Sequence, residues 1–124
     1  MALEHALKSH LDADITVLYV ADSVDAGSYT ELTGNPSEHD DRYREDAEAV
    51  FAEADALAGE HDRTVTTELS VGKPARTIIE FAEMGNIDHI VIGSHGRSGA
   101  SRILLGSVAE RVVRRAPVPV TVVR

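Results

Sequence analysis

Two periods of hydrophobicity alternate along the chain, and this alternation limits the folds that it can adopt. Short runs rich in β-branched apolar residues, typical of buried parallel strands, occur at residues 14–20, 64–71, 88–93 and 118–123. Segments with the apolar spacing of helices lie before and between these runs, at residues 3–11, 37–59, 74–84 and 108–116. Leu11 and Val50 are expected on the apolar faces of the first two, and Pro74 and Gly85 delimit the third. This order predicts an α/β fold with a parallel sheet. Pro119 cannot donate to a strand ladder, so the last strand is expected at an edge.

Length and composition exclude several classes of protein. The 124 residues suit one domain over residues 1–124, with no repeat or linker. No apolar run approaches the roughly 18 residues of a membrane helix, and no secretory leader is recognisable. Cysteine is absent, which removes disulfides and thiolate chemistry and suits a cytoplasmic location. The six histidines form no tight pair along the sequence, so we expect no metal site.

Charge is distributed unevenly along this acidic chain. The net charge of −9 disfavours nucleic acids and anionic membranes as partners, and it suggests adaptation to high salt as in halophilic proteins. Residues 93–124 nevertheless carry six arginines and one glutamate. Arg111, Arg114 and Arg115 fit either a solvated helix face or a basic site, whereas Arg97 and Arg102 lie in or beside a glycine-rich loop.

That loop follows a predicted strand and precedes a predicted helix. Gly93 ends the strand, where ligands of open α/β sheets bind, and Gly96 lets backbone amides approach an anion. Ser107 and Glu110 have the spacing of a capping box, which predicts a helix start at Gly106-Ser107. A helix start offers unpaired amides to a phosphate. Each glycine taken alone is equally explained as a turn; their combination favours a phosphate cradle.

The spacing also separates this loop from better-known phosphate loops. The pattern G-x-x-x-x-G-K-[ST] is absent, and so is the dinucleotide pattern G-x-G-x-x-G. Gly93-x2-Gly96-x9-Gly106-Ser107 instead resembles the ATP-binding signature of the universal stress protein (UspA) family. The flanking stretches "DHIVIGSHGRSG", "LLGSVAERVVRRAPVPVTVVR" and "VGKPARTIIEFA" are similar to this family as well.

The resemblance implies a three-layer open sheet, like that of adenine nucleotide alpha hydrolases, with helices on both faces. It implies ATP, with or without Mg²⁺, as the ligand, and a homodimer through the last strand, Val118–Val123. The glycines and Ser107 would hold phosphates, Ser94, His95 and Arg97 would line the loop, and Ile92, Val108 and Val20 would lie near the nucleotide. The nucleotide-binding residues implied by the family are Val20, Ile92, Gly93, Ser94, His95, Gly96, Arg97, Gly106, Ser107 and Val108.

The family pattern begins with a strand that this sequence lacks. The chain opens inside a helical pattern at Met1, and the family's first strand, with the aspartate that contacts the nucleotide, has no counterpart. That strand would lie in the middle of the sheet, so we expect an N-terminally truncated fold. Three explanations remain open: a natural start further upstream, a strand supplied by another chain, or a degenerate copy.

Three functions compete on this sequence. The first is a nucleotide-binding stress or signalling module that switches conformation or partners. The second is a slow ATPase, although no pair of residues suits metal binding and positioning of a nucleophile. The third is a dimeric interaction protein that no longer binds nucleotide. We expect no catalytic residues, and leave open the nucleotide, the triggering stress, the protein partners and hydrolysis.

Overall fold

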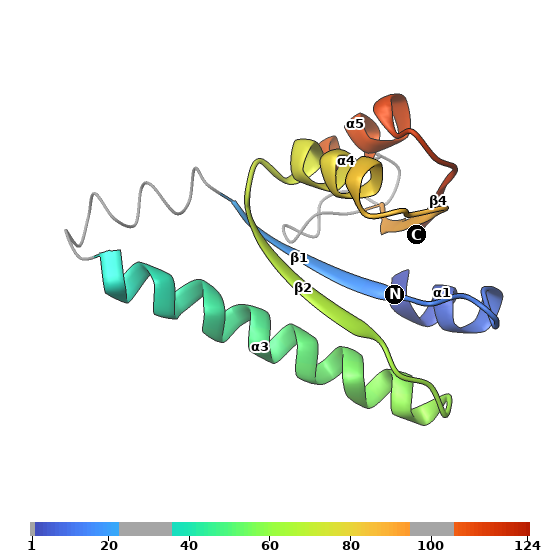
Figure 1. The fold of residues 1–124 in the computed structure, drawn as a ribbon, viewed down its shortest axis with the longest axis horizontal. Helices are drawn as coiled ribbons and strands as arrows, with labels where there is room; N and C mark the ends of the chain where they lie inside the picture. The colour runs from blue at the N-terminus through green and yellow to red at the C-terminus, as the bar shows by residue number, and fades with distance from the viewer. Residues whose placement is uncertain (1, 23–35, 95–105) are drawn as a thin grey trace. The chain divides into compact units, whose positions relative to one another are not determined.

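The computed structural model describes residues 2–22, 36–94 and 106–124, which fold into parallel strands and helices in the predicted order (Figure 1). The α/β prediction is therefore confirmed. The chain divides into two compact units, residues 12–73 and residues 1–11 with 74–124. Each unit is described below by itself.

The unit of residues 12–73 is a two-stranded parallel sheet covered by one long helix. Strand β1 (Thr16–Asp22) pairs with β2 (Thr66–Gly72), Thr16 lying opposite Thr66. Helix α3 (Pro36–Glu60) packs against β1 (Figure 1). Ala47, one of its buried alanines, packs with Tyr19 of β1. The rings of Tyr19 and Phe51 meet edge to face, with their centres 6.4 Å apart. Aromatic pairs in this arrangement contribute beyond their buried area.

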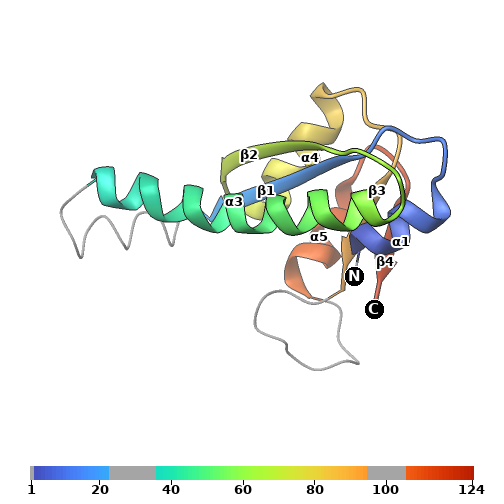
Figure 2. The same ribbon diagram turned by 90° about the horizontal axis from the view of Figure 1, so that it is seen from below.

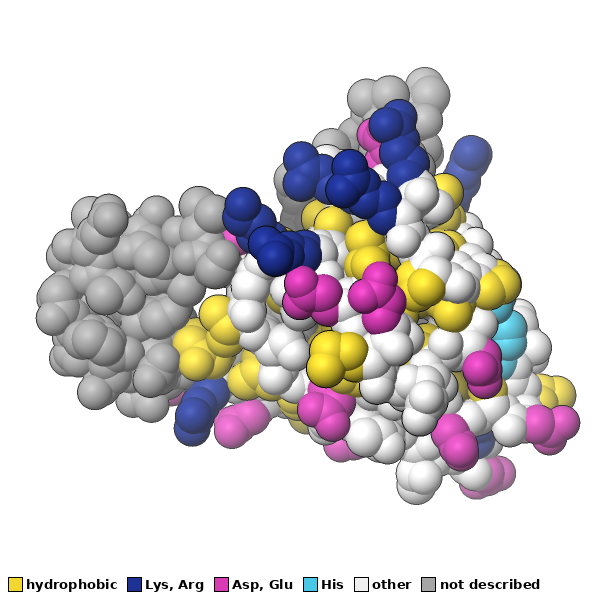
Figure 3. Space-filling model, turned by 45° about the horizontal axis from the view of Figure 1, so that its top comes forward, with side chains coloured by type: hydrophobic (Ala, Val, Ile, Leu, Met, Phe, Trp, Pro, Cys, Tyr) yellow, Lys and Arg dark blue, Asp and Glu magenta, His cyan; other side chains and the backbone are white. Residues whose placement is uncertain are grey.

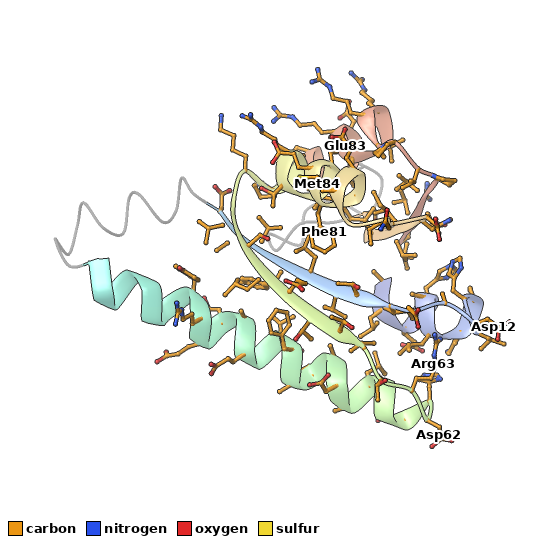
Figure 4. The ribbon with its side chains drawn as sticks, in the orientation of Figure 1. Asp12, Asp62, Arg63, Phe81, Glu83 and Met84 are labelled. Carbon is orange, nitrogen blue, oxygen red and sulfur yellow. The ribbon has the colours of Figure 1, made fainter. Side chains whose placement is uncertain are left out.

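A tight turn joins α3 to β2 in the same unit. Asp62 takes a left-handed backbone conformation, with φ of 56°, which short polar side chains tolerate better than most. Arg63 then donates a hydrogen bond from Nη2 to the carbonyl oxygen of Ala13, so the turn is tied to the segment that leads into β1. Figure 4 labels Asp62, Arg63 and Asp12 at this end of the unit.

The second unit has helices on two sides of its strands. Strand β3 (Ile90–Gly93) pairs in parallel with β4 (Val120–Val123), Ile90 lying opposite Val120. Helix α1 (Ala2–Ser9) contacts both strands, and α5 (Ser107–Arg115) contacts β4 and α4 (Pro74–Met84). Figures 1 and 2 show α1 on one side of the β3–β4 pair and α4 with α5 on the other. Three layers are thus present within this unit.

Alanines dominate the core. The buried apolar residues are Ala6, Leu7, Tyr19, Ala21, Ala47, Ala54, Ala58, Ala75, Ala82, Ala109 and Val112. Leu7 and Val112 are the largest side chains buried completely, and both belong to the second unit. Small side chains let helices approach strands closely, but they bury little apolar area each.

Two expected core residues are exposed instead. Leu11, predicted to extend the stripe of the first helix, is 71 % exposed because α1 ends at Ser9 and the chain turns away. Val50, predicted on the apolar side of α3, is 38 % exposed, since the alanines Ala47, Ala54 and Ala58 form the buried stripe of that helix. The apolar spacing located both helices correctly but did not fix which of their residues meet the strands.

The described strands form two ladders rather than one sheet. β1 pairs only with β2, and β3 pairs only with β4, so within the described residues each strand has one edge without a partner. Pro119 precedes β4, and its carbonyl oxygen accepts the amide of Ile90 at 3.0 Å. Nowhere in residues 2–22, 36–94 and 106–124 is there a helix long and apolar enough to cross a membrane.

Candidate functional site

The end of β3 and the start of α5 are held together by backbone hydrogen bonds. The amide of Gly106 donates to the carbonyl oxygen of Ser94 at 2.7 Å, and the amide of Ser94 donates to that of Val123 at 2.8 Å. The ladder between β3 and β4 therefore continues through Ser94 and fixes the residue that begins α5. The carboxyl end of a parallel strand and the amino end of a helix meet at this point.

Ser94 carries an unsatisfied hydroxyl at this junction. The residue is 4 % exposed, and its Oγ has no hydrogen-bond partner within the described part of the chain. A buried hydroxyl left unpaired costs about 1–3 kcal/mol, so native proteins rarely retain one without a role. A ligand that reached the end of β3 would supply the partner that this hydroxyl lacks within the described residues.

The first turn of α5 is also unsatisfied, and here the predicted capping box is wrong. The residue before the helix is Gly106, with φ of −61° and ψ of 152°, and no side chain of the described residues caps the helix. Ser107 is the first helical residue, so its hydroxyl is not in position to cap. The first backbone bond of the helix runs from the amide of Glu110 to the carbonyl oxygen of Gly106 at 2.9 Å. The amides of residues 107–109 therefore have no acceptor within the helix.

Unpaired amides at a helix start attract anions. The partial positive charge of the helix dipole lies at the same end, and the two effects together favour phosphate or carboxylate groups. Ser107 is exposed, and Gly106 and Val108 are half-buried, so the first turn of α5 is open to solvent. Gly106 leaves the approach free because it has no side chain.

The structure brings together six of the ten predicted site residues. Ile92, Gly93 and Ser94 end β3, while Gly106, Ser107 and Val108 begin α5. Val20 lies in β1, in the other unit. His95, Gly96 and Arg97, as well as Arg102, lie outside the described residues.

Basic side chains gather over α4 and α5, as Figure 3 shows. Arg111, Arg114 and Arg115 on α5 are exposed, and Arg114 forms an ion pair with Glu110 at 2.8 Å. On α4, Arg76 pairs with Glu80 at 3.0 Å. Such exposed pairs within one helix contribute little stability. The arrangement of Arg114 matches the solvated helix face that the sequence allowed.

One cluster of polar side chains was not predicted from the sequence. The rings of His10 and His89 lie 4.9 Å apart, and Nε2 of His89 is 2.7 Å from the hydroxyl oxygen of Thr121. These residues are distant in sequence, so no spacing rule could have found them. Among the described residues, no group of three or more His, Cys, Asp or Glu is placed to hold a metal ion.

The fold and this junction define an open α/β protein in which a parallel strand ends where a helix with unpaired first amides begins. The model of the universal stress protein family matches residues 1–124. The chain therefore belongs to the universal stress protein family.

Relatives support this assignment at the level of sequence and of structure. Universal stress protein MJ0531 of Methanocaldococcus jannaschii is 35 % identical over 130 residues, covering 99 % of this chain and 73 % of the relative. The solved structure of MJ0577, from the same organism, has a TM-score of 0.80 and 31 % identity, covering 98 % of this chain and 84 % of that one.

A further solved structure is that of a universal stress protein in complex with cAMP. It has a TM-score of 0.65 over 99 % of this chain and 84 % of its own, with 23 % sequence identity. At this identity the likeness concerns the fold alone.

Proposed function

We propose that the chain binds ATP, and that it acts as a stress-response or signalling module that switches conformation or partners. One observation carries this proposal: the backbone hydrogen bond from Gly106 to Ser94 joins a residue with an unpartnered hydroxyl to the uncapped start of α5. A triphosphate supplies acceptors for all of these donors and negative charge for the helix dipole. The resemblance of Gly93-x2-Gly96-x9-Gly106-Ser107 to the family's ATP signature supports the same ligand.

The site residues have separate roles in this proposal. Gly93, Gly96 and Gly106 let the backbone approach the phosphates, and the Ser94 and Ser107 hydroxyls donate to phosphate oxygens. His95 and Arg97 line the phosphate loop. Ile92 and Val108 flank the nucleotide, and Val20 lies near adenine or ribose. When Mg²⁺ accompanies ATP, its remaining ligands are phosphate oxygens and water, since magnesium binds few protein groups alongside substrate phosphates.

The test is calorimetric titration with ATP in the presence and absence of Mg²⁺, with phosphate release measured in parallel. We expect saturable binding without turnover. Ser94→Ala removes one hydroxyl from a buried position and should weaken ATP binding about tenfold, by the loss of one hydrogen bond to a charged group. Ser70→Ala is the matched control, because Ser70 lies in β2 of the other unit.

Other outcomes identify the competing functions. Phosphate release that disappears in Ser107→Ala would indicate a slow ATPase. If the chain does not bind ATP, the remaining hypothesis is a dimeric interaction protein. The strand edges without a partner in the described residues favour this function. A titration with cAMP in the same buffer shows whether the site requires a triphosphate.

We further propose a homodimer that forms through the last strand, Val118–Val123. The edge of β4 opposite β3 has no strand partner within the described residues, and an exposed strand edge rich in valine favours pairing with another strand. Val122→Pro removes one backbone donor and should shift the sedimenting species from dimer to monomer. A wild-type chain that sediments as a monomer at micromolar concentration would contradict the dimer.

The composition of the chain supports two proposals about the protein's surroundings. A cytoplasmic location agrees with a chain that has no cysteine. Adaptation to high salt agrees with a net charge of −9, since screening relieves repulsion between like charges. If this is correct, the free energy of unfolding rises between dilute buffer and molar KCl; a constant or falling value would refute the adaptation.

A further inference from the structure

The rings of two histidines, His10 and His89, lie next to each other in the second unit. His10 follows α1, and His89 immediately precedes β3, so the pair joins a helix to the β3–β4 ladder. The ring centres are 4.9 Å apart, and the ring planes are inclined at 49°. Both residues are half-buried, which leaves one side of the pair accessible to solvent.

The spacing of the rings suits two imidazoles that bind the same ion. A metal bound about 2.1 Å from a ring nitrogen lies roughly 3.2 Å from the centre of that ring. Two such rings at coordination angles of about 90° to 109° have their centres about 4.5 to 5.2 Å apart. The observed 4.9 Å falls within this interval.

A third side chain, that of Thr121, contacts His89, and the tautomer of the ring decides which nitrogen is available. Nε2 of His89 lies 2.7 Å from Oγ1 of Thr121, a residue of β4. When the ring donates its Nε2–H to this hydroxyl, the lone pair of Nδ1 is free to bind a metal. Ligating histidines usually donate their second N–H in this way, and the donated bond fixes the ring. Within the described residues, the ring of His10 has no hydrogen-bond partner, so its nitrogens are also available.

We propose that His10 and His89 bind a divalent transition-metal ion of the kind that prefers imidazole, such as Zn²⁺, with Thr121 as the residue that positions His89. Water completes the coordination, because the described residues supply no third ligand. This site is separate from the proposed phosphate site, which is formed by the end of β3 and the start of α5.

Metal binding at this pair has a structural consequence. It would link the end of α1 to β3, two elements far apart in the sequence. An ion that binds only the folded state stabilises it by a free energy that grows with the logarithm of the ion concentration relative to the dissociation constant. We therefore expect the melting temperature to rise on addition of Zn²⁺.

The experiment is calorimetric titration of the full chain with ZnCl₂, without nucleotide, together with thermal melting. His10→Gln and His89→Gln should each weaken Zn²⁺ binding more than tenfold and abolish the rise in melting temperature. Thr121→Val keeps both ligands and should weaken binding about tenfold, as loss of an outer-shell partner does. His61→Gln is the control. Because His61 belongs to the other unit, this variant should bind Zn²⁺ as the wild type does.

A second measurement does not depend on the stability of any variant. In the wild-type chain, Zn²⁺ should shift the imidazole NMR signals of His10 and His89 together and leave that of His61 in place. The proposal is overturned if Zn²⁺ does not bind, if either glutamine variant binds it as wild type does, or if the two signals do not shift.

Discussion

At the scale of single residues, Gly106 leaves the start of α5 without a side-chain cap. Its φ of −61° is open to any L-residue, so the position does not require glycine for its backbone conformation. What glycine provides is the absence of a side chain. A serine or aspartate at the same place would cap α5 with its own oxygen and compete with an anion for the free amides.

Gly106→Asp should therefore have opposite effects on stability and on binding. Capping of α5 should raise the free energy of unfolding by a few tenths of a kcal/mol, because glycine is already a tolerable residue before a helix. ATP affinity should fall at least tenfold, since the carboxylate occupies the amides and repels phosphate. Urea denaturation and calorimetric titration measure the two effects. Gly106→Ala, which cannot cap, is the control; an aspartate variant that keeps wild-type affinity would exclude these amides from the site.

At this scale the sequence placed a strand end at Gly93 and a helix start at Gly106-Ser107, as the structure has them, but it misassigned the capping role and missed one pair. Motif spacing predicted Ser94, Gly106 and Ser107 as site residues, because strand ends and helix starts can be read from local patterns. It made Ser107 the capping residue, since the S-x-x-E spacing is the same whether the helix begins one residue earlier or later. The contact between His10 and His89 depends on tertiary packing, so no local pattern contains it.

At the scale of secondary structure, strand β3 has two chemically different edges. The amides of Ile90 and Ser94 donate to carbonyls of Pro119 and Val123, at 3.0 and 2.8 Å. In a parallel ladder, alternate residues use the same edge, so the amides of Val91 and Gly93 face the opposite one. No strand pairs with that opposite edge within the described residues.

Hydrogen exchange should resolve this alternation. We expect the amides of Ile90 and Ser94 to exchange at least tenfold more slowly than those of Val91 and Gly93, because bonded amides exchange only when the structure opens. NMR-detected exchange in the chain without ligand measures all four rates. Equal protection of the two sets would mean that a further segment pairs with the second edge.

The elements themselves were well predicted, within about two residues at the strand starts. β-branched runs and helical apolar stripes are strong local signals, and Gly85 and Pro74 delimited α4 correctly. The failures at Leu11 and Val50 have one cause. Periodicity gives the direction in which a side chain points from its own helix, but burial depends on whether another element lies there.

At the scale of the whole molecule, we propose that the two units operate as one domain, as the length of the chain suggests. The chain offers a natural reporter for this question. All three tyrosines lie at positions 19, 29 and 43, within residues 12–73, and there is no tryptophan. Tyrosine fluorescence therefore reports on that unit alone, whereas Leu7 is buried completely in the other one.

Leu7→Ala tests whether the units unfold together. Removal of this buried side chain should lower the free energy of unfolding by about 2–5 kcal/mol. In one cooperative domain, the midpoint of urea unfolding seen by tyrosine fluorescence falls as far as that seen by circular dichroism. Leu11→Ala, at a residue 71 % exposed, should change neither midpoint appreciably. A tyrosine transition unchanged by Leu7→Ala would show two independent domains.

The hydrogen bond between Gly106 and Ser94 also fixes the separation between the end of β3 and the start of α5. Both anchors are backbone groups, so side-chain substitutions leave this joint chemically unchanged. For protein engineering, a library of side-chain substitutions near the joint can therefore vary its chemistry while the two ends keep their register.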